Sequence, residues 1–340
     1  MTATPLGFDT GRLADHLETA LPGTGPVTLE PISGGFSNPS FFMDFGGERY
    51  VLRKQPPGEL LPSAHAIDRE FRVLSALQGT AVPVPAALHY CADAGVIGTP
   101  FYVMERLDGR VFHDNALPGL PPRQRAAMFE AMNATLAALH QLDLDALGLR
   151  DFGRTGGFFA RQIARWTRQY EAAKTRDIDE IPELAGWLAA HLPEDDETTL
   201  VHGDYRLGNL IFHPSRPEIL GVLDWELSTL GHPLSDLGYN LMPWTMRPSE
   251  QAGLAGLDLA QLGIPAMRAY AARYFAHRGL PDGYHPFYTA FAFFRLAVIF
   301  EGIVSRAAQG ISVPGAADVA HLGRVWARHG LTLAGDGNGL

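Results

Sequence analysis

The pattern of hydrophobic residues changes near residue 106, and this change limits the folds open to the chain. Before it, short β-rich segments alternate with turn residues, and the pair Gly46-Gly47 separates two of these segments. A two-residue glycine connection between β-rich runs is typical of a hairpin. After residue 106, helical periodicity dominates. This order predicts an α+β protein whose first part is a small antiparallel sheet, with a cleft between two lobes where ligand sites tend to lie.

The individual elements follow from periodicity and turn residues. We expect an amphipathic helix at residues 10–20, a helix from Ser63 to about residue 78, and strands at 27–30, 40–45, 48–54, 86–92 and 101–107. Further helices are expected at 122–141, 157–174, 183–191, 234–242, 265–278, 285–308 and 316–329. One β-hairpin, formed by residues 210–213 and 218–223, interrupts the helical part.

Composition excludes several classes of protein. A chain of 340 residues is long for one domain, so two are expected. The net charge of -10 disfavours a nucleic-acid-binding protein. The single cysteine, Cys91, rules out a disulfide framework and a cysteine-rich zinc site, and it is expected to be a small core residue. The most apolar stretch, residues 290–300, is short and contains Arg295, and the start shows no secretory pattern. We therefore expect a cytoplasmic protein that binds neither membrane nor nucleic acid.

The most informative segment runs from His202 to Asn209. Within it Asp204 and Asn209 are five residues apart, and Asp224 follows at the end of the expected hairpin. Phosphoryl transfer needs such residues, because a carboxylate receives the proton of the attacking hydroxyl and Mg²⁺ prefers carboxylate and amide oxygens. A loop followed by a hairpin that returns to the same place can bring these three side chains around one phosphate.

Four segments carry a resemblance to a known family: SGGFSNPS, YVLRKQPPGELLPSAHAIDREFRVLSAL, LVHGDYRLGNLIF and GVLDWELSTLGHPLSDLGY. Over nearly its whole length the chain resembles the aminoglycoside-phosphotransferase-like kinases, and within them the kinase-like domain associated with acyl-CoA dehydrogenases. The resemblance implies a bilobal protein-kinase-like fold. Residues 1–106 would form a nucleotide-binding lobe with a β-sheet and a helix, and residues 107–340 a helical lobe with the catalytic loop, the hairpin and the acceptor site.

The resemblance also implies roles for the loop residues. Asp204 matches the catalytic aspartate, which orients the acceptor hydroxyl and takes its proton. Arg206 stands where a cation would stabilise the transferring phosphoryl group. Asn209 and Asp224 match the two Mg²⁺ ligands. The residues expected to hold the loop itself are His202 and Asp236.

In the first lobe the resemblance implies a nucleotide site. The phosphate-covering turn matches Ser33, Gly34, Gly35, Ser37 and Asn38. Arg53 stands at the position of the phosphate-binding lysine, and Glu70 matches its ion-pair partner. The carbonyl of Glu105 and the N–H of Leu107 would bond adenine. Lys54 adjoins Arg53, but strand alternation lets only one of them face the cleft, and we favour Arg53.

The expected cofactors are ATP and Mg²⁺, and the expected acceptor is a small molecule with a hydroxyl group. The short stretch from Asp224 to Asp236 leaves no room for the long segment on which protein kinases dock a protein substrate. The acyl-CoA dehydrogenase association implies a hydroxyacyl-CoA or a hydroxy acid as acceptor, and a functional link to such a dehydrogenase.

Other interpretations stay open. The chain could be a nucleotide-binding module with little turnover, since Arg53 replaces lysine, or an aminoglycoside phosphotransferase, which the eight arginines and six acidic residues of positions 241–340 disfavour. A hydrolase metal cluster would draw on His202, Asp204, His213, Asp224, His232 and Asp236. Arg161, Arg165 and Arg168 share one helical face, which is either solvated or a docking strip for an anionic substrate. Arg295, Glu301 and Arg306 are candidates for lining or bracing the acceptor site.

Overall fold

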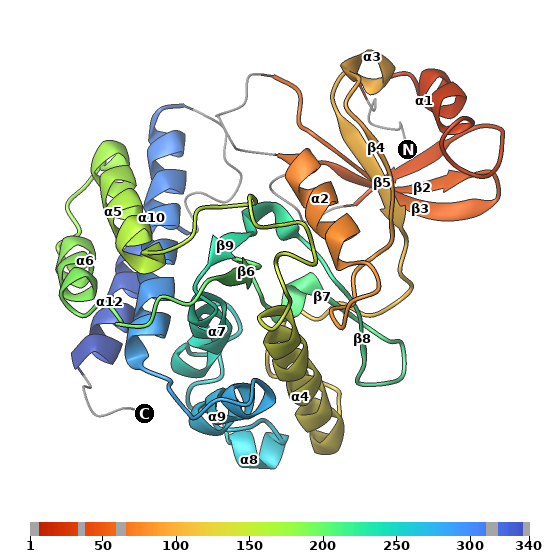
Figure 1. The fold of residues 1–340 in the computed structure, drawn as a ribbon. Coiled ribbons are helices and arrows are strands. Elements are labelled where there is room, and N and C mark those ends of the chain that lie inside the picture. Colours follow the sequence, from red (N-terminus) through yellow and green to blue (C-terminus); the bar gives the residue numbers. More distant parts are fainter. Residues whose placement is uncertain (1–6, 33–37, 59–65, 311–318, 336–340) are drawn as a thin grey trace. The chain divides into compact units, whose positions relative to one another are not determined.

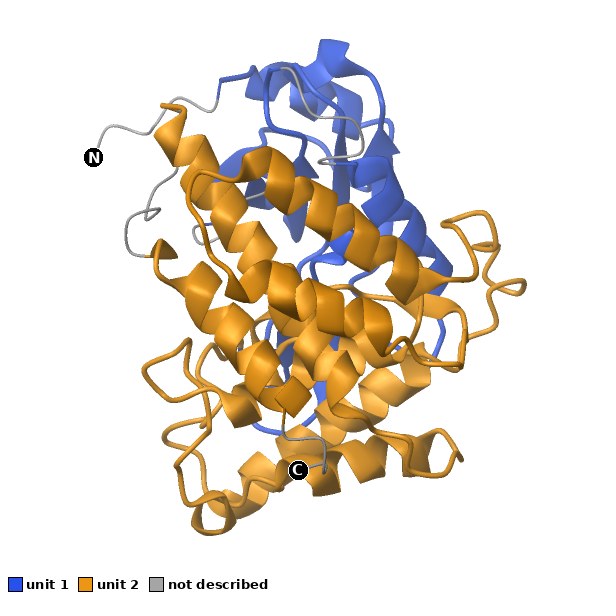
Figure 2. Cartoon of the chain, turned by 90° about the vertical axis from the view of Figure 1, so that its left-hand side faces the viewer, with its two compact units in different colours: residues 1–110, 210–227 blue, residues 111–209, 228–340 orange. Residues whose placement is uncertain are grey.

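The computed structural model describes residues 7–32, 38–58, 66–310 and 319–335, and it divides into two compact units (Figures 1 and 2). Unit 1 comprises residues 1–110 and 210–227, and unit 2 comprises 111–209 and 228–340. The chain therefore passes between the units three times.

The hairpin at residues 210–223 belongs to unit 1, whereas the sequence-based division assigned it to the second domain, 107–340. Its contacts give the reason. Phe212 pairs with Arg110, and the N–H of Val222 donates to the carbonyl of Pro83 over 2.8 Å. A Cβ added at Gly221 would lie 2.4 Å from the side chain of Leu107, so the hairpin packs closely on the segment that follows the first sheet.

Unit 1 is built on a five-stranded antiparallel sheet, as the sequence predicts. The strand order is β1-β2-β3-β5-β4. The strands are β1 (Thr28–Pro31), β2 (Ser40–Phe45), β3 (Glu48–Lys54), β4 (Ala87–Cys91) and β5 (Phe101–Glu105), and the added hairpin consists of β7 (Leu210–Phe212) and β8 (Ile219–Val222). Gly46 and Gly47 join β2 to β3 with φ angles of 61° and 84°, a left-handed conformation that favours glycine.

Helices cover both faces of this sheet. On one face, α1 (Thr10–Leu17) and α3 (Ala94–Ile97) bury their apolar residues with Met43, Leu52 and Phe101 in one core. On the other face, α2 (Ile67–Leu77) contacts β4 and β5. Because side chains alternate along a strand, β3 sends Leu52 toward α1 and Arg53 toward α2. The expected helix start at Ser63 lies outside the described residues.

Unit 2 is mainly helical. Its helices are α4 (Pro122–Leu139), α5 (Phe158–Ala173), α6 (Glu180–Ala190), α7 (Leu234–Leu241), α8 (Leu259–Leu262), α9 (Met267–His277), α10 (Pro286–Ala308) and α12 (Leu322–Gly335). Figure 1 shows α10 beside α5, α7 and α12, which it contacts along its length. A two-stranded sheet that the sequence did not predict pairs β6 (Thr199–Val201) with β9 (Thr229–Gly231). Its three-residue strands are too short to show a hydrophobic period.

The helix α10 confirms the helix predicted at residues 285–308, and it extends on both sides of the apolar stretch at residues 290–300. Among the described residues, this 23-residue helix is the one whose length and composition would allow it to cross a bilayer. In the structure, 67% of the most apolar 18-residue segment of this helix is buried inside the protein. The helix contacts α5, α6, α7 and α12. Its hydrophobicity is that of a core helix.

Helices α7 and α10 approach so closely that a side chain does not fit at Gly238. A Cβ there would lie 2.3 Å from the carbonyl oxygen of Tyr288. Replacing Gly238 by Ala should therefore force the helices apart and lower the free energy of unfolding by about 1–3 kcal/mol. Gly186 in α6 is the matched control: a Cβ meets nothing within 4 Å, and Gly186→Ala should raise stability by about 0.5–1 kcal/mol. Urea unfolding of both variants tests this, and equal effects would contradict the packing argument.

Candidate active site

A buried carboxylate fixes the loop that leads from β6 to β7. Asp236, on α7, accepts hydrogen bonds from the backbone N–H groups of His202 at 2.6 Å and Gly203 at 2.8 Å. The Nε2 atom of His140 lies 3.3 Å from the same carboxylate. Burial alone would raise the pKa of Asp236, but the bonds from His140 and from the backbone outweigh it and hold the pKa below its usual value. The loop is thus anchored at its first two residues.

The anchored loop presents the carboxylate of Asp204. Asn209 donates through Nδ2 to the Asp204 backbone carbonyl at 2.9 Å and to Oδ2 at 2.8 Å. Arg206 donates through Nε to Oδ2 at 3.2 Å. The N–H of Asp204 itself donates to Nδ1 of His202, which ties the start of the loop to its centre. These bonds fix the direction of a carboxylate whose side chain is 17% exposed.

Two residues brace the loop from the helices behind it. Burial raises the pKa of the Tyr239 hydroxyl, and the nearby Asp204 carboxylate, to which it is hydrogen-bonded, raises it further, so this hydroxyl stays protonated and acts as a donor. The guanidinium of Arg295 lies over the Tyr239 ring, 5.2 Å from its centroid, and donates to the carbonyl of Gly203. Sequence reasoning singled out Arg295 but missed Tyr239. The signal was its position three residues after Asp236, which places both on one face of α7.

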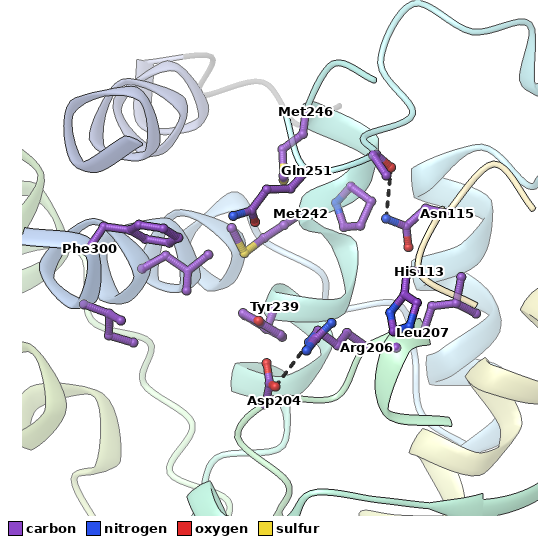
Figure 3. A pocket seen from close by; sticks show the side chains of 15 residues that line it. His113, Asn115, Asp204, Arg206, Leu207, Tyr239, Met242, Met246, Gln251 and Phe300 are labelled. Atoms are coloured by element: carbon purple, nitrogen blue, oxygen red, sulfur yellow. Dashed lines mark hydrogen bonds and ion pairs between the residues drawn. The ribbon is translucent and has the colours of Figure 1, made fainter. Parts of the chain in front are cut away.

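Asp204 lies at the edge of a pocket of about 580 Å³ within unit 2 (Figure 3). Most of its wall is apolar and comes from Met242, Pro243, Met246, Leu296, Ile299 and Phe300. Polar groups come from His113, Asn115, Arg206, Tyr239 and Gln251. Asp204 is the one carboxylate among the 15 residues that line the pocket. The pocket thus combines an apolar wall with a single, fixed carboxylate.

Unit 1 contains a second group of charged residues, centred on Arg53. Its Nε lies 2.8 Å from Oε2 of Glu70, which is the expected ion pair, and its Nη2 lies 2.8 Å from Oδ1 of Asp224. Glu70 also accepts hydrogen bonds from Asn38 at 2.5 Å and from the Tyr102 hydroxyl at 3.0 Å. Burial alone would lower the pKa of Arg53, but the surrounding carboxylates raise it, so the guanidinium stays charged.

The neighbouring cation, Lys54, points to the other face of the sheet. Its Nζ lies 5.5 Å from the centroid of the Phe8 ring, and burial lowers its pKa. Lys54 pairs with Phe101, whereas Arg53 pairs with Tyr102, as strand alternation requires. Of the two cations, the structure thus places Arg53 beside Asp224.

Asn209 in unit 2 and Asp224 in unit 1 each offer an oxygen of a type that suits a hard divalent cation. Because Nδ2 of Asn209 faces Asp204, its Oδ1 is directed away from that carboxylate, and it offers a neutral amide oxygen. Asp224 follows β8 with a φ of 66°, a left-handed conformation that is uncommon for residues other than glycine and often marks functional positions. A carboxylate and an amide oxygen are the ligand types that Mg²⁺ prefers. Asn209 belongs to unit 2 and Asp224 to unit 1.

Comparison with known proteins identifies the family of the chain. The model of the phosphotransferase enzyme family matches residues 28–273. The chain belongs to this family. Mouse acyl-CoA dehydrogenase family member 10 is 46% identical over 307 residues, which are 87% of this chain and 28% of that protein. Chicken acyl-CoA dehydrogenase family member 11 is 41% identical over 340 residues, 96% of this chain and 44% of that protein. The phosphotransferase chain spans less than half the length of either relative.

Solved structures confirm the predicted kinase-like fold. A Ralstonia eutropha crystal structure, named as an aminoglycoside phosphotransferase, is 43% identical, with a TM-score of 0.88 over 96% of this chain and 98% of that one. The aminoglycoside phosphotransferase APH(4)-Ia, solved with ADP and hygromycin B, is 16% identical, with a TM-score of 0.63 over 97% of this chain and 99% of that one. At that identity the second likeness concerns the fold alone.

The other predicted nucleotide contacts lie in unit 1. Ser33, Gly34, Gly35 and Ser37 fall outside the described residues, and Asn38 donates to Glu70. The backbone N–H of Glu105 donates to Ala86 over 2.9 Å, and its carboxylate accepts from the N–H of Ala86. Leu107 lies against the hairpin at Gly221. The roles of these residues toward a nucleotide stay predictions.

The proposed hydrolase metal cluster does not form within the described part of the chain. None of its six residues belongs to a group of three whose ligand atoms lie within 4.8 Å of one another. Both oxygens of Asp236 accept backbone N–H groups, and the ring of His232 stacks on Tyr288 with 5.7 Å between centroids. These side chains hold the loop and the core of unit 2.

The remaining candidate charges are mainly structural. Arg161 donates to the carbonyls of Arg154 and Thr155 just before α5, and Arg165 lies over the Trp166 ring. Glu301 forms an ion pair with Arg176 at 2.6 Å. The exposed residues Arg168 and Arg306 do not line the pocket beside Asp204.

The anchoring carboxylate gives a pH-dependent prediction. Asp236→Asn replaces one acceptor by an amide N–H₂, leaves a buried backbone N–H unpaired, and should lower the free energy of unfolding at pH 7 by about 1–3 kcal/mol. Because the folded-state pKa of Asp236 is below the ordinary 3.8, its contribution is complete above that value and is lost as the pH falls through the folded-state pKa. Urea unfolding at pH 7 and in acid should show the difference shrinking. The control Asp258→Asn, at an exposed helix cap, should have little effect, and a pH-independent difference would contradict the assignment.

Proposed function

We propose that this phosphotransferase moves the γ-phosphoryl group of ATP to a hydroxyl group of a small molecule, and that the acceptor is a hydroxyacyl-CoA or a hydroxy acid. The observation that supports this most directly is the Asp204 carboxylate, fixed by Asn209, Arg206 and Tyr239 at the edge of a mainly apolar pocket. A volume of about 580 Å³ lies in the range of small-molecule sites.

The reaction needs little covalent chemistry from the protein. Asp204 accepts a hydrogen bond from the acceptor hydroxyl and directs its oxygen toward the γ-phosphorus. As the new O–P bond forms, the bond between that phosphorus and the β–γ bridging oxygen breaks and ADP leaves. The hydroxyl proton passes to Asp204 and from there to solvent. Arg206, beside Asp204, is placed to offset the negative charge on the transferring group.

The nucleotide contacts are proposed from unit 1. Arg53, kept charged by Glu70, would contact the α- and β-phosphates, with Ser33, Gly34, Gly35, Ser37 and Asn38 covering the phosphates and Glu105 and Leu107 bonding adenine. Asn209 and Asp224 would hold Mg²⁺. When bound, this ion neutralises phosphate charge and polarises the phosphoryl group. The ion pair between Arg53 and Asp224 orients one carboxylate oxygen, which leaves the other for a metal.

The wall of the pocket favours an acyl chain over a polycationic antibiotic. Met242, Met246 and the α10 residues give the pocket its apolar side, and Asp204 is its one carboxylate. A polycation would need several carboxylates to replace its hydration. The two relatives named above support the same choice, since both are acyl-CoA dehydrogenase family members that extend well beyond this chain. We therefore also propose a functional link to an acyl-CoA dehydrogenase.

A transfer assay tests the reaction and the acceptor together. Purified protein with Mg-ATP is offered hydroxyacyl-CoAs, hydroxy acids and aminoglycosides, and products are followed by mass spectrometry for a gain of about 80 Da, one phosphoryl group. Transfer to the first two classes supports the proposal. Transfer to aminoglycosides alone would overturn the acceptor class, and ATP binding without transfer to any class would favour a nucleotide-binding module.

Replacing Asp204 by Asn should lower kcat by about 10²–10⁴-fold, because the base is lost while the size of the side chain is kept. The affinity for Mg-ATP, measured by calorimetry, should change little. Asp177→Asn, at an exposed surface ion pair, is the matched control and should retain full activity. An Asp204→Asn variant with the turnover of the wild type would exclude this residue as the base.

The two adjacent cations of β3 allow a matched comparison. Arg53→Met removes the guanidinium beside Asp224 and should weaken ATP binding by about 10–100-fold, as expected for loss of a charged hydrogen bond. Lys54→Met makes the same change on the opposite face and should leave ATP affinity within about twofold. Calorimetry measures both, with circular dichroism to confirm folding. A larger loss of affinity in Lys54→Met than in Arg53→Met would reverse the assignment.

A further inference from the structure

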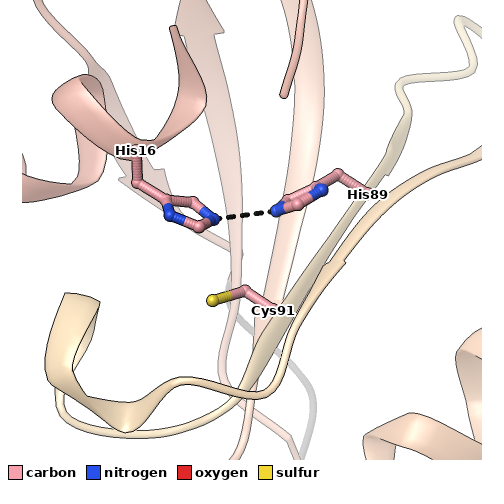
Figure 4. Close-up of side chains that lie close together, drawn as sticks. All are labelled: His16, His89 and Cys91. Atoms are coloured by element: carbon pink, nitrogen blue, oxygen red, sulfur yellow. Dashed lines mark hydrogen bonds between the residues drawn. The ribbon is translucent and has the colours of Figure 1, made fainter. Parts of the chain in front are cut away.

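Three potential metal ligands converge on the face of the unit 1 sheet that is opposite to Arg53. They are His16 in the last turn of α1 and His89 and Cys91 on β4 (Figure 4). Their ligand atoms all lie within 4.8 Å of one another. His89 and Cys91 are two residues apart on one strand, so both side chains project toward α1. Among the described residues this is the one group of three or more such side chains that meets that distance.

The two imidazoles face each other through the nitrogen atoms that bind metals. His16 Nε2 and His89 Nε2 are 2.9 Å apart, so without a metal one proton must lie between two lone pairs. A neutral imidazole is the form that ligates a metal. Both Nε2 atoms become available to a metal when the shared proton moves to Nδ1 of its own ring, which leaves both imidazoles neutral.

The three side chains lie among apolar residues and are accessible from one side. The ring centroid of Phe101 lies 5.8 Å from that of His16 and 6.3 Å from that of His89, and Ile97 and Leu17 belong to the same apolar core. Cys91 is 5% exposed, while both imidazoles are half-buried, so an ion can reach the group from their side. Cys91 is a free thiol, so metal binding must release its proton.

We propose that His16, His89 and Cys91 form a Zn²⁺ site that fastens α1 to β4. Two imidazole nitrogens and one thiolate suit Zn²⁺, with a water molecule as fourth ligand, and do not suit Mg²⁺ or Ca²⁺. Tetrahedral ligation at about 2.0–2.1 Å requires the two nitrogens to separate to roughly 3.3 Å, a small movement of two side chains. The site would join residues 73 positions apart in the sequence. It uses none of the residues assigned to phosphoryl transfer.

Co²⁺ is a spectroscopic probe that can test this site in the 340-residue chain, prepared without an affinity tag. Because Cys91 is the single cysteine of the chain, a sulfur-to-cobalt charge-transfer band can come only from this residue. Titration with Co²⁺ should give this band together with the intense visible bands of tetrahedral cobalt, saturating at one ion per chain. Zn²⁺ should abolish the spectrum by displacement, and its binding should weaken as the pH falls, since the thiol proton must leave.

Variants separate the site from surface binding. Cys91→Ser should remove the charge-transfer band, and His16→Gln or His89→Gln should weaken Co²⁺ binding at least about tenfold. His191→Gln is the matched control, because His191 stacks on Trp187 in unit 2, and should bind like the wild type.

A second measurement covers variants that fold poorly. Zn²⁺ should raise the Tm of the wild type and of His191→Gln, but not that of Cys91→Ala, since an ion stabilises only a state that binds it. A wild-type cobalt spectrum without the thiolate band would overturn the proposal. So would a Co²⁺ affinity in the His16→Gln and His89→Gln variants that equals that of the wild type. The three side chains would then be a hydrogen-bonded histidine pair beside a core cysteine. Phosphoryl transfer is assayed separately, so failure of one proposal does not imply failure of the other.

Discussion

The hydrogen bonds from the backbone of His202 and Gly203 to the buried carboxylate of Asp236 are the interaction on which the candidate active site depends. A carboxylate removed from water is costly unless it is fully paired, and here two backbone donors and His140 pair it. The turn that follows needs a φ of 82° at Gly203, which only glycine adopts without strain. This turn, together with the hydrogen bonds from Asn209 and Arg206, fixes the orientation of the Asp204 carboxylate. A carboxylate that acts by orienting a reactant, without forming a covalent bond to it, must itself be held in a fixed position.

Strand alternation in the sheet of unit 1 places the adjacent cations Arg53 and Lys54 on opposite faces. Arg53 and Tyr102 meet Glu70 on one face, and Lys54 meets Phe8 on the other. A shift of one residue in the register of β3 would exchange the two cations and place a flexible ammonium beside Asp224. The tight Gly46-Gly47 turn, which joins β2 to β3, fixes that register. The nucleotide contacts proposed for Arg53 therefore rest on the geometry of a hairpin several residues away.

Much of this could be predicted from the sequence, because it depends on local periodicity or on motifs. The antiparallel sheet, most helices, the second hairpin and the choice of Arg53 over Lys54 are of this kind. What could not be predicted depends on contacts between distant segments. The pairing of β6 with β9 uses strands of three residues that carry no period. The lining of the pocket combines Asn115, Tyr239 and Phe300 from three separate segments. Cys91 was expected to be a small core residue, and it is buried, but nothing in the sequence placed His16 beside it.

The helix α10 shows why hydrophobicity alone gave an incomplete interpretation of this segment. Its apolar residues serve two surfaces. One packs against α5, α6, α7 and α12, while Leu296, Ile299 and Phe300 recur at helical spacing and line the pocket. Arg295, next to these three, reaches the loop carbonyl of Gly203. A single helix thus shapes the apolar wall of the pocket and braces the loop that carries Asp204. For the proposed acceptors, changes at Leu296, Ile299 or Phe300 can alter which acyl chain fits, whereas changes at Arg295 act on the position of the base.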